Sequence, residues 1–133
     1  MRGGVDRPSL RRERCMKENR KPGVSPALRD DEIIMEVCKF IKAHLAEELT
    51  YKRIEEELFV SRYHLSAKFP ARMGMSVTAY IIRQRLLCVI DLVEKGAGLE
   101  DASFRAGFNT YSHFYKKFVQ VYKISPREYF KKK

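Results

Sequence analysis

The chain has 133 residues, of which 44% are hydrophobic and 33% are charged, and its formal net charge is +10. This length fits one domain with a tail, and the composition is that of a globular protein with a folded core. No apolar run approaches the roughly 20 residues that a membrane-spanning helix needs, and the basic N-terminus lacks the apolar stretch of a secretory signal. Three widely spaced cysteines favour reduced thiols in a cytoplasmic protein over disulfides or a metal site.

Residues 1–30 predict a basic, disordered N-terminal arm. They carry nine basic and four acidic groups and three prolines, and no apolar period runs through them. We expect the domain proper to span residues 31–133, with Asp30 or Asp31 as the N-cap of its first helix.

The remaining sequence predicts an all-α fold of about seven helices, because apolar residues recur at helical spacing and no segment alternates with period two. The first helix is expected over residues 32–46, and Thr50 is expected to cap the second. A third helix is expected to start at Ser61 and to end before Gly74. Ser76 is expected to cap a long fourth helix. The later elements are predicted at residues 76–95, 100–106, 110–122 and from Pro126 onward.

Residues 61–80 recur at residues 110–129 with a constant offset of 49. The matching pairs share a hydroxyl, imidazole, apolar, basic or phenolic character: Ser61/Thr110, His64/His113, Leu65/Phe114, Lys68/Lys117, Phe69/Phe118, Ser76/Ser125 and Tyr80/Tyr129. Such a repeat indicates one supersecondary unit used twice. A short helix, a turn and a second helix in each copy predict two helix-turn-helix units, over about residues 50–73 and 99–122.

The second helix of such a unit enters the major groove of DNA, so its outward side chains are candidate DNA contacts. For the first copy these are Arg62, Tyr63 and Ser66. For the second copy they are Thr110, Tyr111, Ser112, Tyr115 and Lys116. Phosphate contacts are expected from Thr50, Lys68, Arg72 and Lys117. Residues 59–133, which hold both recognition helices, carry fourteen basic and five acidic groups.

The expected linker helix of about 18 residues is roughly 27 Å long. This length lets one chain hold two recognition helices near one DNA turn apart, about 34 Å. We therefore expect a monomer to bind an asymmetric site of about two turns of double-stranded DNA.

Chemistry other than DNA binding finds little support in the sequence. It shows no Gly-rich phosphate loop, no nucleophile with a paired base and no spaced carboxylate pair, so we expect no catalytic residue, no enzyme activity and no cofactor. His64 and His113 lack companions at ligand spacing, so we expect a packing or phosphate role and no metal.

A specific run of residues points to one family. Gly107-Phe108 is followed by Ser112, Phe114 and Phe118, then by Ser125-Pro126 and Glu128-Tyr129, and further matches are Ser61, Leu65, Phe69, Gly74, Ser76, Tyr80, Arg85 and Leu86. Over residues 31–130 the chain resembles the DNA-binding domain of the AraC/XylS family of bacterial transcription regulators. The resemblance implies two homeodomain-like helix-turn-helix units joined by a linker helix. It also implies a nucleoid-associated protein that binds promoter DNA, with RNA polymerase as a second partner.

Several residues depart from the family pattern, mostly in the first unit. A small alanine is replaced by Glu55, the turn glycine by Phe59, and a basic residue by Pro70. The family's cationic base-reading position is Ala67, which we include in the first recognition surface. In the second unit Ser103 replaces an alanine and Lys123 replaces a glycine, which are milder changes. We therefore expect the helix at 110–122 to contribute more specificity.

Two function classes remain open from the sequence. The first is a sequence-specific transcription regulator, and the second is a protein-interaction or antagonist module with an impaired first unit. The sequence leaves open whether the chain is a stand-alone regulator or a fragment, and whether translation starts at Met1 or Met16. No small-molecule ligand is evident.

Overall fold

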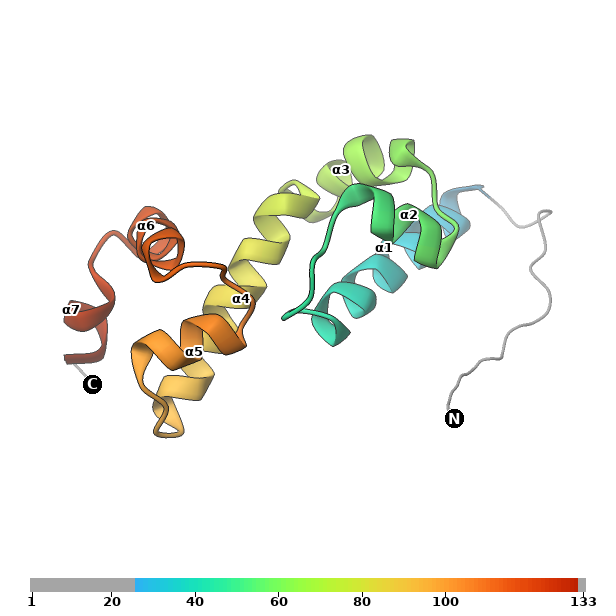
Figure 1. Cartoon of the computed structure of the whole chain (residues 1–133). Coiled ribbons are helices and arrows are strands. Elements are labelled where there is room, and N and C mark those ends of the chain that lie inside the picture. The colour runs from blue at the N-terminus through green and yellow to red at the C-terminus, as the bar shows by residue number, and fades with distance from the viewer. Residues whose placement is uncertain (1–25, 132–133) are drawn as a thin grey trace. The chain divides into compact units, whose positions relative to one another are not determined.

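The computed structural model describes residues 26–131. Within this range the chain forms seven α-helices, one short π-helical segment and no strand, which confirms the all-α prediction (Figure 1). In chain order the elements are α1 (Pro26–Ala43), α2 (Tyr51–Leu58), η2 (His64–Lys68), α3 (Phe69–Met73), α4 (Val77–Glu94), α5 (Leu99–Arg105), α6 (Tyr111–Tyr122) and α7 (Pro126–Lys131). None of the helices in this range is long and apolar enough to cross a membrane.

The bounds of α1 correct one prediction. The helix starts at Pro26, so Asp30 and Asp31 lie inside it and are not its N-cap, and residues 26–30 are helical. Proline suits a helix start because its fixed φ is helical and its missing N–H has no partner in the first turn anyway. The helix also ends at Ala43, before the expected residue 46. The rest of the predicted arm, residues 1–25, lies outside the described residues.

Two hydrophobic cores hold the helices together, and α4 contributes to both. The first core is built from α1, α2 and the η2–α3 segment, and it includes Val77, Tyr80 and Ile81 from the start of α4. The second core is built from α5, α6 and the turn between them, and it includes Leu86 and Val89 from the middle of α4. Figure 1 shows α4 running from the α2–α3 region to the α5–α6 region.

Hydroxyl side chains cap the starts of α2, α4 and α6, and the sequence predicted the first two of these caps, at Thr50 and Ser76. Thr50 Oγ1 accepts the Arg53 N–H at 3.0 Å, and Ser76 Oγ accepts the Ala79 N–H at 3.0 Å. Thr110 Oγ1 accepts the His113 N–H at 3.1 Å in the same way. Each bond satisfies a backbone donor that lacks a partner in the first helical turn.

The third predicted helix has the expected ends but an unforeseen middle. Its residues 64–68 are π-helical, because the Phe69 N–H donates to the His64 carbonyl, five residues back. In a regular helix the ring of Pro70 would clash with the carbonyl of Ser66, and Pro70 has no N–H to donate. The wider π turn immediately before it relieves this conflict. Gly74, with a φ of 79°, ends α3 as predicted.

Arg85 of α4 stabilises the turn between α1 and α2 through two hydrogen bonds to backbone carbonyls. Its Nε donates to the Leu45 carbonyl at 3.0 Å, and its Nη2 donates to the Glu47 carbonyl at 2.8 Å. Desolvation by burial lowers the pKa of this guanidinium from its usual value. Gly107 lies against the same contact: a Cβ built there would be 2.5 Å from the Leu45 carbonyl oxygen and 2.6 Å from Arg85 Nε. The turn of the second unit therefore reaches this contact only because residue 107 has no side chain.

Candidate nucleic-acid interface

The first recognition segment, which comprises the helical residues 62–73, presents all four of its predicted contact residues to solvent. Arg62, Tyr63, Ser66 and Ala67 are exposed, while Leu65 and Phe69 on the opposite side are fully buried. Burial of one side fixes the direction of the other, because the segment cannot rotate without exposing both apolar side chains. The Ser66 hydroxyl donates to the Arg62 carbonyl at 2.9 Å, so its proton is already used within the helix.

Arg62 is held by two neighbours that belong to α2. Its Nε donates to Glu55 Oε2 at 2.5 Å, and its guanidinium carbon lies 5.0 Å from the centre of the Tyr51 ring. The Arg62 side chain is still 60% exposed, whereas that of Glu55 is 28% exposed. This arrangement combines an ion pair with a cation–π contact.

The second recognition helix, α6, presents Ser112, Tyr115 and Lys116 to solvent, and its cap Thr110 is exposed as well. Tyr111 differs from the prediction, because it is half-buried and packs against the second core. Its ring centre lies 5.4 Å from that of Phe114 and 6.4 Å from that of Tyr115. Part of the Tyr111 ring therefore packs in the second core and contributes to its stability.

The predicted phosphate contacts differ in their exposure. Thr50 and Arg72 are exposed, while Lys68 and Lys117 are half-buried. Thr50 already caps α2, and Lys68 Nζ lies 5.7 Å from the centre of the Tyr63 ring.

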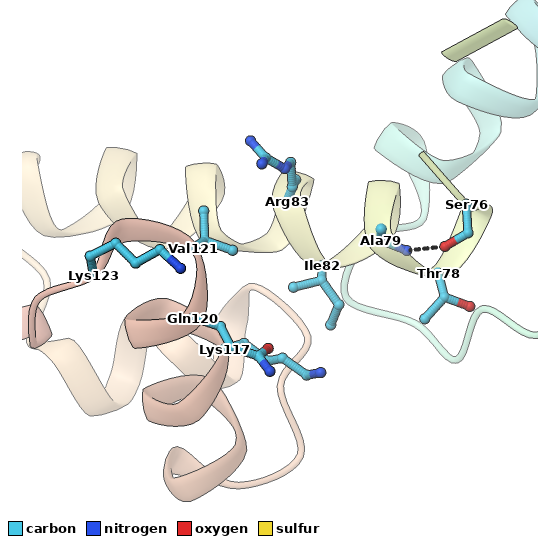
Figure 2. A pocket seen from close by; sticks show the side chains of 9 residues that line it. All are labelled: Ser76, Thr78, Ala79, Ile82, Arg83, Lys117, Gln120, Val121 and Lys123. Atoms are coloured by element: carbon cyan, nitrogen blue, oxygen red, sulfur yellow. Dashed lines mark hydrogen bonds between the residues drawn. The ribbon is translucent and has the colours of Figure 1, made fainter. Parts of the chain in front are cut away.

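An open groove of about 540 Å³ lies between the first half of α4 and α6 (Figure 2). Its lining combines three basic groups with polar and small apolar side chains: Ser76, Thr78, Ala79, Ile82, Arg83, Lys117, Gln120, Val121 and Lys123. Figure 2 shows that the side chains of Arg83 and Lys117 extend away from each other. The lining of the groove thus carries two basic residues besides Lys117, namely Arg83 and Lys123.

Two turn residues adopt backbone conformations that favour glycine. Phe59 follows α2 with a φ of 57°, and Lys123 follows α6 with a φ of 69°. Both positions were singled out from the sequence as replacements of a family glycine. The Phe59 side chain is 93% exposed, so packing does not compensate for the left-handed conformation.

Sequence reasoning missed the partners of the recognition residues. Tyr51 carried no signal, and Glu55 was identified only as a replacement of the family's small alanine. Arg85 was recognised as a family match without a role. Arg62 and Glu55 lie seven residues apart on two different helices, and the turn between the helices brings them together. The periodicity of a single helix does not predict such a contact.

Comparisons with known proteins identify the family and the fold of the chain. A family model described as a helix-turn-helix domain matches residues 54–132. The HTH-type transcriptional regulator YbfI of Bacillus subtilis is 35% identical over 83 residues, which cover 62% of this chain and 30% of that protein. The regulatory protein PocR of Salmonella typhimurium is 26% identical over 100 residues, which cover 74% of this chain and 33% of that protein. The chain thus spans about a third of the length of these relatives.

Solved structures show the same fold at lower sequence identity. The C-terminal domain of AraT, a response regulator from Geobacillus stearothermophilus, superposes with a TM-score of 0.71 at 22% identity, over 84% of this chain and 88% of that one. A transcriptional regulator with an AraC-type DNA-binding domain from Chromobacterium violaceum gives 0.68 at 22% identity, over 76% and 91%. The chain belongs to the family of AraC-type helix-turn-helix transcription regulators.

Proposed function

We propose that this chain binds promoter DNA sequence-specifically by inserting the η2–α3 segment and α6 into successive major-groove segments. One observation carries the proposal: each segment buries one side in its own core and exposes the opposite side, and both cores share α4. At 18 residues, α4 is about 27 Å long. One polypeptide then supplies the two recognition helices for which a dimer would otherwise be needed.

The charges of the described residues support DNA as the partner. Exposed Lys116 lies on the outward side of α6, and Arg83, Lys117 and Lys123 line the neighbouring groove. Such groups attract the phosphate backbone without regard to sequence, while Ser112 and Tyr115 face outward where base edges would lie. We further propose that the protein acts on DNA as a monomer and that RNA polymerase is its second partner.

A selection of bound sequences from a random pool of DNA duplexes at about 150 mM salt tests the proposal. We expect an enriched motif of two parts about 10 base pairs apart. A single short motif would restrict base reading to one unit. Binding without any enriched sequence, lost as salt rises, would contradict the proposal.

A protein-interaction or antagonist module is the second candidate. Phe59 favours it, because a large apolar side chain that is 93% exposed in a left-handed conformation contributes nothing to the fold around it. Phe59→Ser separates the two candidates, since it should leave DNA affinity unchanged for a regulator and abolish partner capture for an interaction module.

A further inference from the structure

The first recognition segment carries its positive charge at one of its four predicted base-facing positions. Arg62 is cationic, whereas Tyr63, Ser66 and Ala67 are neutral. Arginine makes the commonest specific contact to a base, a bidentate pair of hydrogen bonds to the O6 and N7 atoms of guanine. Such a contact needs both the charge and the planar fork of the guanidinium to be presented in one orientation.

The surroundings of Arg62 restrict its orientation before DNA arrives. Glu55 takes up Nε at 2.5 Å, and the Tyr51 ring lies 5.0 Å from the guanidinium carbon. In the part of the chain that the structure describes, the hydrogen bonds of the guanidinium use Nε and leave both terminal nitrogens without a protein partner. The side chain is 60% exposed, so these nitrogens are accessible.

We propose that Glu55 and Tyr51 form a clamp that orients Arg62 to read a guanine in the first major-groove segment. The inference rests on the proposed DNA-binding function and assigns a base to one of its contacts. A long arginine loses rotamer freedom when it binds. The clamp already restricts the Arg62 side chain in the free protein, so the side chain loses less conformational entropy when it binds DNA. Glu55 and Tyr51 are positioning residues, and Arg62 is the residue that contacts DNA.

The geometry also explains why the charge of Glu55 does not merely repel DNA. Its carboxylate is directed to Arg62 and is only 28% exposed, whereas Glu56, the next residue along α2, is exposed. Glu56 therefore provides a matched control: Glu55→Gln and Glu56→Gln each remove one negative charge from the same helix. Only the first change removes the negative charge that pairs with Arg62, and it leaves an amide oxygen that can still accept from Nε.

The test compares sequence selections made with the full chain and with its Arg62→Ala, Arg62→Lys, Glu55→Gln and Glu56→Gln variants. We expect the wild-type motif to contain a guanine that Arg62→Ala no longer prefers. Dissociation constants on that site and on its single-base variants should show a guanine preference of about 5-fold to 100-fold. Glu55→Gln and Arg62→Lys should each reduce it by at least about 5-fold, and Glu56→Gln should leave it within twofold.

Two results would overturn the clamp. If Arg62→Ala weakened the affinity for all DNA sequences equally, Arg62 would contact phosphate and not a base. Tighter binding of every sequence by Glu55→Gln, beyond the effect of Glu56→Gln, would mean that Glu55 holds Arg62 away from DNA. Failure of the wild type to select any sequence would instead contradict the proposed function itself. Circular dichroism of each variant verifies folding, which substitutions at these three positions should leave intact.

Discussion

Two glycines of this chain share a left-handed backbone but differ in what surrounds them. Gly96 has a φ of 107° with open space where a Cβ would stand, and Gly107 has a φ of 113° with the Leu45 carbonyl and Arg85 at that place. Substitutions at the two positions therefore distinguish two destabilising effects: the strain of a left-handed conformation, present at both, and the clash of a Cβ with neighbouring atoms, present only at Gly107. Only the structure distinguishes the two positions, because each is simply a glycine in the sequence.

Gly107→Ala should destabilise the fold much more than Gly96→Ala. The left-handed conformation costs an alanine about 1–2 kcal/mol at either position. At Gly107 the new methyl group also displaces the Leu45 carbonyl or Arg85, so we expect a total loss of at least about 3 kcal/mol. Urea unfolding measures both values. Equal losses would show that the turn shifts without disturbing the Arg85 contact.

Phe59→Gly should stabilise the chain although it deletes a large side chain. Phe59 is 93% exposed with a φ of 57°, so little packing is lost and the strained conformation is relieved. The gain of about 1–2 kcal/mol is partly offset by the greater freedom of glycine in the unfolded chain, about 0.5–1 kcal/mol. Thermal unfolding should show a small rise in Tm, and Lys123→Gly should act in the same direction. A lower Tm for Phe59→Gly would reveal a packing role for the ring.

At the scale of elements, the sequence predicted what depends on local pattern. The caps at Thr50 and Ser76 follow from residue type and spacing, and the core face of α6 follows from its period. Thr110 was expected inside the helix and is its cap instead. The π turn before Pro70 was not predicted. It relieves the clash between the Pro70 ring and the Ser66 carbonyl, and the spacing of apolar residues does not show how a helix relieves such a clash. Which exposed side chains touch DNA stays a prediction.

The two recognition elements should differ in their share of the binding energy. Lys116→Ala in α6 should weaken binding to the selected site more than Tyr63→Ala in the first segment, because α6 adjoins the groove lined by Arg83, Lys117 and Lys123. Fluorescence anisotropy on one duplex gives both dissociation constants. Equal losses would show that the first unit, despite its π turn and Pro70, contributes as much as the second.

At the scale of the whole described structure, Arg85 connects parts that are far apart in sequence. It joins the turn between α1 and α2 to α4, and Gly107 brings the turn after α5 to the same contact. The sequence identified Arg85 only by resemblance, because its acceptors are backbone carbonyls, which every residue has.

Arg85→Lys should show how much this contact stabilises the molecule. Lysine keeps the charge but loses the planar fork that reaches two carbonyls, so we expect a loss of about 2 kcal/mol. Arg83→Lys is the matched control, because Arg83 is exposed on the same helix. Hydrogen exchange of residues 45–49 should accelerate in the first variant alone. Unchanged exchange there would show that the turn is held by other contacts, such as those of Arg53 with Glu47 and the Glu48 carbonyl.

The sharing of one uninterrupted helix by both cores constrains how this protein and its binding site can change during evolution. Each residue inserted into α4 would turn everything beyond it by about 100° and advance it by about 1.5 Å. A base pair instead turns its successors by about 35° and advances them by about 3.4 Å. Three added base pairs would match the turn but overshoot the advance by about 9 Å. The length of α4 and the spacing of the proposed operator must therefore be inherited together, whereas a single base and the residue that reads it can change as a pair.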